Sequence, residues 1–140
     1  GERNPETVRR KVARALEMVN MTGHDKKMPV NLSGGMRKRV ALARAIISPP
    51  SVILYDEPTA GLDPIVSDSI NRLIRHLQEE LHVTSIVVTH DMVSCRHIAD
   101  RVALLDEGRI RFLGSVDELQ TTSDQVVRDF VDGRSGGSVY

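Results

Sequence analysis

Two short runs of apolar and β-branched residues, separated by one long amphipathic segment, constrain the fold of this chain more than any other feature. The runs cover residues 51–55 and 84–89. Asp63-Pro64 lies between them and provides a helix N-cap followed by a first-turn proline. Apolar residues then recur at helical spacing at positions 66, 70, 73, 74, 77 and 81. Continuous apolar runs are typical of strands in a parallel sheet. The pattern therefore predicts a strand–helix–strand unit of an α/β domain.

The segments before the first run are predicted to be helical. Asn4 can cap a helix with Pro5 at its first position, and Gly23 is the expected stop. Ser33 can cap a second helix that continues to about Ile47. This part of the chain contains no strand signal, which indicates a small helical subdomain ahead of the sheet.

The segments after the second run are predicted to be a short helix, a hairpin and a last helix. Their ranges are 92–99, 101–105 with 109–113, and 124–131. Ser115 and Glu118 form a capping box between the hairpin and the last predicted helix. We therefore predict a helical portion at 1–48, the α/β core at 49–132 and a disordered Gly/Ser-rich tail at 133–140.

Composition limits the class of protein. Lys plus Arg and Asp plus Glu both number 19, so the formal net charge is zero, which argues against a dedicated nucleic-acid binder. The single cysteine, Cys95, cannot form an internal disulfide and fits a reducing compartment. No apolar run approaches the ~20 residues that span a bilayer, and the N-terminus has neither a signal-peptide core nor an initiator Met. We expect a soluble, cytoplasmic piece of a longer protein.

The first motif with a chemical interpretation is Leu32-Ser33-Gly34-Gly35-Met36. Two glycines after a capping serine allow the backbone to approach an anion, and the helix N-terminus behind them offers unpaired N–H groups. This arrangement can bind phosphate. The alternative is a simple N-cap with a flexible lead-in.

The second motif places two carboxylates, Asp56 and Glu57, at the end of the first apolar run. Ligands of α/β sheets bind at the carboxyl ends of the strands. Neighbouring residues of an extended chain point in different directions, so Asp56 can serve a Mg²⁺ ion while Glu57 faces an attacking water as general base. The alternative is a strand that ends in a solvated acidic turn.

Two further motifs follow. Gly61-Leu62-Asp63 comes soon after the carboxylates, and Asp63 alone is explained as a helix cap. His90 ends the second apolar run, where it can reach a phosphate or position a water. The alternative for His90 is a structural histidine.

In this order, the four motifs resemble those of the ABC ATPases. Residues 32–36 resemble the signature loop, and residues 53–56 resemble Walker B with Glu57 in the catalytic glutamate position. Residues 61–63 resemble the D-loop, and His90 the switch histidine. The resemblance covers about residues 4–131. It implies the C-terminal part of a P-loop (RecA-like) ABC ATPase domain, together with the end of its helical subdomain.

The resemblance also implies roles for single residues. ATP and Mg²⁺ would be held between two ATPase subunits arranged head to tail. Glu57 would polarise the attacking water, His90 would contact the γ-phosphate, and Asp56 would hold Mg²⁺ through water. The partner subunit's nucleotide would be met by the signature residues Ser33, Gly34 and Gly35, and Asp63 would cross the dimer interface.

One motif of the family is absent. No G-x-x-x-x-G-K-[ST] phosphate loop occurs, and the chain contains no Gly-Lys dipeptide. The phosphate-loop half of the domain is therefore expected to lie outside these residues. We expect the chain alone to be inactive as an ATPase.

Met36 stands where the family usually has glutamine. This residue and the segment 125–133 resemble the ATPases of MCE-associated, Mla-type lipid transporters. That subgroup implies phospholipid transport, membrane permease partners, an MCE-type substrate-binding protein, and a peripheral location on the cytoplasmic face of the inner membrane. The alternative is a soluble ABC ATPase that acts on nucleic acid or ribosomes; the single motif set and the zero net charge favour the transporter, with no nucleic-acid partner.

Overall fold

The structure is a computed structural model that describes residues 4–134. It divides into two compact units, residues 1–90 and 91–140, and each is described by itself. The predicted boundary between residues 48 and 49 falls inside the first unit and stays a prediction. In the described part of the chain, no helix combines the length and the apolar character needed to cross a membrane.

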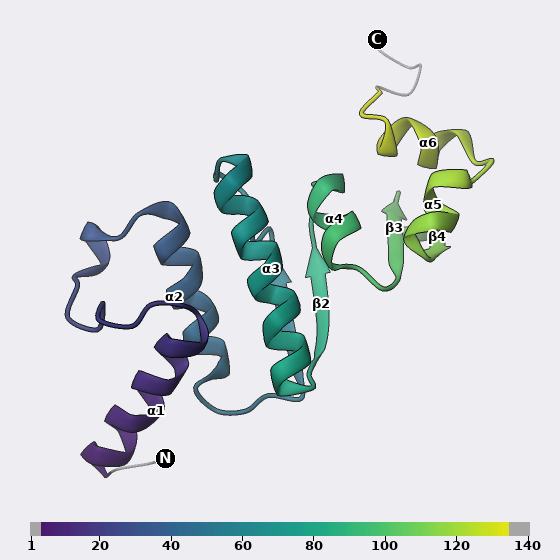
Figure 1. The fold of residues 1–140 in the computed structure, drawn as a ribbon. Helices are drawn as coiled ribbons and strands as arrows, with labels where there is room; N and C mark the ends of the chain where they lie inside the picture. Colours follow the sequence, from purple (N-terminus) through teal and green to yellow (C-terminus); the bar gives the residue numbers. More distant parts are fainter. Residues whose placement is uncertain (1–3, 135–140) are drawn as a thin grey trace. The chain divides into compact units, whose positions relative to one another are not determined.

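Within the described residues 4–90, the first unit contains three α-helices, two strands and one 3₁₀ turn (Figure 1). In chain order they are α1 (Pro5–Met18), η1 (Pro29–Asn31), α2 (Gly34–Ile46), β1 (Val52–Asp56), α3 (Pro64–Leu81) and β2 (Thr84–Val88).

The helix starts follow the predicted caps. The Asn4 side chain accepts hydrogen bonds from the first turn of α1, Ser33 from that of α2, and Asp63 from that of α3. The predicted stop at Gly23 is wrong: α1 ends at Met18, and Asn20 turns the chain with a φ of 56°. Asparagine tolerates this left-handed conformation better than most residues, so the glycine is not needed to end the helix.

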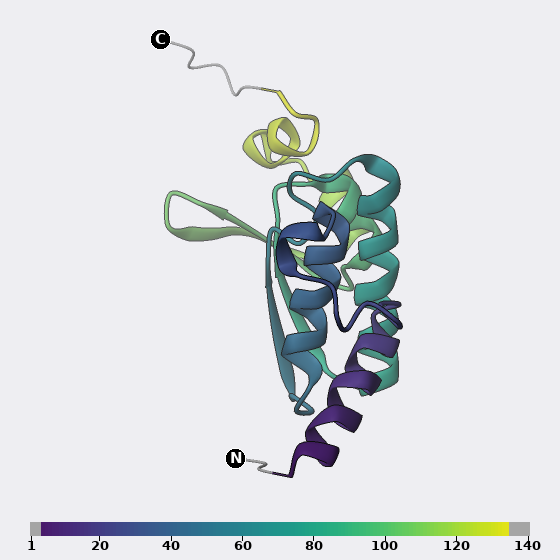
Figure 2. The same cartoon turned by 90° about the vertical axis from the view of Figure 1, so that its left-hand side faces the viewer.

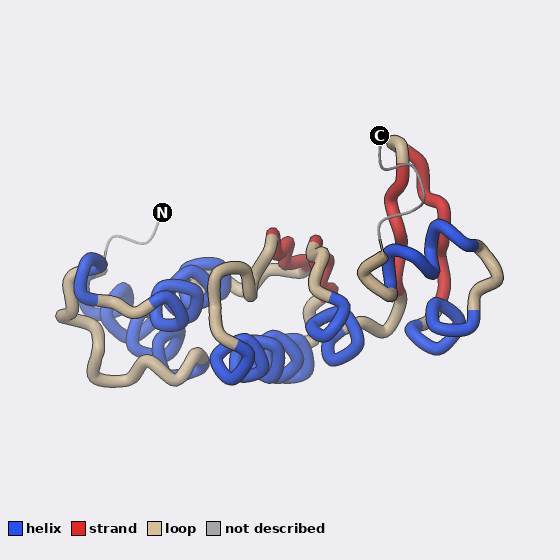
Figure 3. The backbone as a smooth tube through the Cα atoms, turned by 90° about the horizontal axis from the view of Figure 1, so that it is seen from above, coloured by secondary structure: helices blue, strands red, loops and turns tan. Residues whose placement is uncertain are grey.

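The two strands pair in parallel, as predicted, with Leu54 opposite Ile86 and Asp56 opposite Val88. Ile53 and Tyr55 are buried on the face that the helices cover. Figure 3 shows helices on only one side of these strands. The other face is exposed and apolar. We call it the open sheet face; it consists of Val52, Leu54, Ile86 and Val88. The two apolar runs thus form strands that are covered on one face only within the described residues.

The core of the first unit gathers around α3; of its predicted apolar stripe, residues 70, 73, 74 and 77 are buried and residues 66 and 81 are half-buried. Its most deeply buried members are Ile70, Ile74 and Leu77. Arg39 of α2 ties the helices together because its guanidinium donates to the Val19 carbonyl oxygen at 2.8 Å and to Ser69 Oγ at 2.6 Å.

Replacing Asp63 by Ala is expected to destabilise the first unit. Asp63 Oδ1 accepts from the N–H groups of Ile65 and Val66, both at 3.0 Å. Loss of such a cap costs about 1 kcal/mol, which a urea denaturation curve of the chain can measure. Asp63→Asn is the matched control, because asparagine caps a helix about as well as aspartate. Equal losses for both variants would contradict a pure capping role and would indicate that the negative charge itself matters.

Between residues 91 and 134, the described part of the second unit contains three short helices and a hairpin, and the hairpin is clearly visible in Figure 2. In order they are α4 (Met92–Ile98), β3 (Val102–Asp106), β4 (Arg109–Gly114), α5 (Val116–Thr121) and α6 (Gln125–Val131). The hairpin and the Ser115–Glu118 capping box are confirmed. Leu104, Leu119 and Val127 form its small core. Of the predicted disordered tail, residues 135–140 lie outside the described residues.

Candidate functional site

Glu57 leaves the sheet immediately after β1 with an unusual backbone conformation. Its φ is 45°, in the left-handed region that residues with a side chain rarely adopt. Its N–H still donates to the Val88 carbonyl oxygen of β2 at 2.9 Å. The carboxylates of Asp56 and Glu57 are therefore separated by a turn, and not by the alternation of an extended strand that the sequence predicted.

The turn brings the Glu57 carboxylate against His90, which follows β2 at the same edge of the sheet. Glu57 Oε1 lies 2.8 Å from His90 Nδ1 and accepts from the His90 backbone N–H at 3.1 Å. The Thr89 hydroxyl donates to Glu57 Oε2 at 3.4 Å. Two residues that the sequence predicted separately thus form one hydrogen-bonded pair.

These contacts lower the pKa of Glu57 from its ordinary value, with the His90 side chain as the largest cause. An ionised carboxylate only accepts hydrogen bonds, so His90 Nδ1 carries the proton of the shared bond. Because the folded-state pKa lies below the ordinary one, the contact stabilises the fold above the ordinary pKa. That contribution is lost as the pH falls through the lowered pKa.

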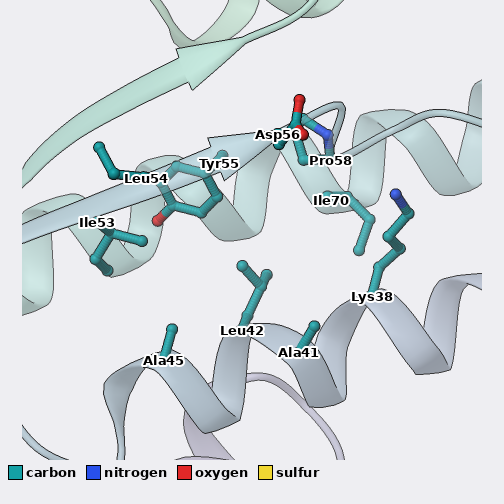
Figure 4. A pocket seen from close by; sticks show the side chains of 10 residues that line it. All are labelled: Lys38, Ala41, Leu42, Ala45, Ile53, Leu54, Tyr55, Asp56, Pro58 and Ile70. Atoms are coloured by element: carbon teal, nitrogen blue, oxygen red, sulfur yellow. The ribbon is translucent and has the colours of Figure 1, made fainter.

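Lys38 is a site residue that sequence reasoning missed. Its Nζ donates to the backbone carbonyl oxygen of Glu57 at 2.7 Å. Figure 4 shows the side chain extending from α2 toward the end of β1, where Asp56 and Pro58 lie. A lysine in a basic run is usually a solvated residue. No sequence signal distinguishes it from its neighbours, because the contact joins residues on different elements.

The signature segment, residues 32–36, leads into α2, which begins at Gly34. Ser33 Oγ accepts from the Met36 N–H at 3.3 Å, so the capping alternative is confirmed as the contact that Ser33 makes here. A Cβ added at Gly35 would meet Val66 Cγ1 at 2.6 Å, and one at Gly34 would meet Leu62 Cδ2 at 3.1 Å. Close packing against the segment around Asp63 therefore excludes a side chain at Gly35 unless Val66 shifts, and leaves little room for one at Gly34. A role toward an anion stays a prediction.

Asp56 ends β1 with an exposed side chain and lines a pocket of about 220 Å³ between α2 and β1 (Figure 4). Among the described residues, no group of three His, Cys, Asp or Glu side chains could hold a metal ion. Mg²⁺ differs from metals held in all-protein cages, since it is bound by one or two carboxylates together with waters and substrate phosphates. The exposed Asp56 carboxylate fits that mode of binding.

The chain is similar in sequence to ATP-binding subunits of ABC transporters. A family model described as ABC transporter matches residues 2–60. The sulfate/thiosulfate import ATP-binding protein CysA of Bacillus cereus is 39% identical over 127 residues, which are 90% of this chain and 36% of that protein. The methionine import ATP-binding protein MetN of Haemophilus ducreyi is also 39% identical over 127 residues, 90% of this chain and 37% of its own length.

A solved structure shows the same fold. It is a dimeric, post-hydrolysis state of the ATP-binding cassette MJ0796 bound to ADP and Pi. Its identity to this chain is 33% and the TM-score is 0.70, over 83% of this chain and 50% of that one. The chain therefore has the α/β fold of an ABC ATPase and covers part of that domain. It is homologous to the ATP-binding subunits of ABC importers, and it spans between about a third and a half of the length of these relatives.

Proposed function

We propose that the chain is the part of an ABC transporter motor subunit that carries the catalytic carboxylate for ATP hydrolysis. The observation that carries this proposal is the Glu57–His90 pair at the carboxyl ends of two adjacent parallel strands. Ligands of α/β sheets bind at this edge. Hydrolysis of ATP requires a group that orients the attacking water there.

In this proposal Glu57 orients and polarises the water. Its lowered pKa keeps it ionised at neutral pH. Its negative charge would orient and polarise the water, in keeping with phosphoryl transfer, where positioning and charge stabilisation dominate. His90 holds the carboxylate in place and contacts the γ-phosphate. Asp56 would hold Mg²⁺ through water, and that ion would neutralise charge on the phosphates.

The remaining predicted residues would act on the nucleotide of a second ATPase subunit. Ser33, Gly34 and Gly35 lie at the N-terminus of α2, where N–H groups point outward. Asp63 directly follows Leu62, whose side chain lies close to Gly34. The dimeric state of the solved relative supports a dimer as the working form, and its head-to-tail arrangement rests on the family resemblance alone.

The transported substrate is the finer part of the proposal. The named relatives import sulfate or thiosulfate and methionine, and another is a probable amino-acid transporter subunit. The proposal of a phospholipid, with an MCE-type partner, rests only on Met36 and residues 125–133. Whichever substrate is transported, the ATPase subunit would bind membrane permease subunits on the cytoplasmic face of the membrane.

The test compares Mg²⁺-ATP hydrolysis by the 140-residue chain with hydrolysis by the natural protein that contains it. We expect no rate above background for the chain by itself, because it has no phosphate loop to neutralise the β- and γ-phosphates. For the natural protein we expect phosphate release at roughly 1–10³ turnovers per second, the usual range for enzymes. Calorimetry of ATP binding to both proteins separates loss of binding from loss of chemistry.

Two results would contradict the proposal. A natural protein that contains a phosphate loop but does not hydrolyse ATP would exclude the motor function. Hydrolysis by the purified chain alone would show that the site is complete within these residues. Transport of labelled phospholipid, sulfate or methionine in reconstituted vesicles would then decide the substrate.

A further inference from the structure

The basic run at the start of α2 binds three different backbone carbonyl groups. Arg37 Nη1 donates to the Leu32 oxygen at 2.7 Å, Lys38 Nζ to that of Glu57 at 2.7 Å, and Arg39 Nη1 to that of Val19 at 2.8 Å. Of these three contacts, only that of Lys38 reaches the candidate site. The other two stay within the helical part of the unit.

The Glu57 backbone needs such support. A left-handed φ at a residue with a side chain persists only where the surroundings hold it. The Glu57 N–H is fixed by Val88 at 2.9 Å, and its carbonyl oxygen accepts from Lys38 at 2.7 Å and from the Ala60 N–H at 3.3 Å. A bond from a charged donor is roughly twice as strong as one from a neutral donor. Lys38 therefore makes the stronger of the two bonds to this carbonyl.

We propose that Lys38 is a positioning residue for Glu57. By holding the carbonyl, it fixes the turn that directs the Glu57 carboxylate onto His90. Since Lys38 lies on the helix that begins at the signature segment, it also links that segment to the catalytic carboxylate. This inference rests on the proposed function, because it assigns Lys38 a role in the same reaction.

The test replaces Lys38 by Met, which keeps the length and the apolar stem of the side chain but removes the donor. The pKa of Glu57 is measured by carbon-13 NMR titration, with Glu57→Gln used to assign the signal. In Lys38→Met we expect this pKa to rise toward its ordinary value, because the contact with His90 loosens. We expect kcat of the natural protein to fall about 10–100-fold, the cost of a small misplacement of a catalytic group, with KM for ATP nearly unchanged.

Two further variants control the result. Lys38→Arg keeps a charged donor and should restore both the lowered pKa and kcat. Arg39→Met removes a comparable bond from the next residue of α2; it should lower stability without changing the pKa of Glu57 or kcat. If Lys38→Met does not fold, Lys38→Gln is measured instead, since its shorter amide leaves the carbonyl without the charged donor.

A folded Lys38→Met or Lys38→Gln variant with an unchanged Glu57 pKa and an unchanged kcat would overturn the proposal. An Arg39→Met variant that shifts the Glu57 pKa and kcat as strongly as Lys38→Met would also overturn the proposal, because the effect would then be a general loosening of α2. Failure of the proposed function looks different. In that case Glu57→Gln would hydrolyse ATP normally, whereas the pKa of Glu57 would still report whether Lys38 positions it.

Discussion

Replacing Glu57 by Gln is expected to lower the rate of ATP hydrolysis by the natural protein about 10²–10⁴-fold, the usual contribution of a general base. ATP binding should remain. The amide preserves the shape of the side chain and can still bond to His90, but it has no negative charge with which to polarise a water. Single-turnover phosphate release measures the chemical step, and filter binding of labelled ATP measures affinity.

Glu107→Gln is a matched control for this prediction. Glu107 also has a left-handed φ, at 46°, and lies in the hairpin turn of the second unit, which contains none of the predicted site residues. Its substitution should leave the rate unchanged. Hydrolysis by Glu57→Gln within about threefold of the normal rate would remove Glu57 from the reaction and leave the Glu57–His90 pair as a structural contact.

The 140-residue chain is expected to self-associate at micromolar concentration through the open sheet face. Val52, Leu54, Ile86 and Val88 are 48%, 74%, 54% and 60% exposed. Burial of each such side chain contributes roughly 1.5–3 kcal/mol. The double substitution Leu54→Lys with Ile86→Lys should therefore weaken association by about 100-fold or more, since each 1.4 kcal/mol is a factor of ten. Sedimentation equilibrium measures the change.

Ile65→Lys is the control for self-association. Ile65 is 82% exposed at the start of α3, outside the open sheet face, so its replacement should leave association unchanged. A wild-type chain that sediments as a monomer with a cooperative melt would show that the open sheet face is tolerated in water. Equal effects of both changes would indicate association through general apolar contact.

The sequence predicted those parts of the fold that depend on local chemistry. Asn4, Ser33, Asp63 and Ser115 cap the helices that they were expected to cap, because a cap involves only the next few residues. The parallel pairing of β1 and β2 was also predictable from the two apolar runs and the helix between them. The end of α1 was not, since Asn20 and Gly23 can both take the left-handed conformation that ends a helix.

The sequence pointed to candidate site residues but not to the contacts that they make. The motifs identified Glu57 and His90, and an extended chain was assumed to separate the roles of Asp56 and Glu57. The Glu57 backbone bonds to Val88 and Lys38 and its carboxylate to Thr89, and all three residues are distant in the sequence. Such tertiary contacts leave no periodicity or spacing that a single sequence can reveal.

The contacts at Gly34 and Gly35 have a mechanical consequence. Because one glycine packs on Leu62 and the other on Val66, the start of α2 and the approach to α3 lie closer together than two residues with side chains would allow. The start of α2 therefore cannot approach α3 any further, and a side chain introduced at Gly35 would displace both segments at once.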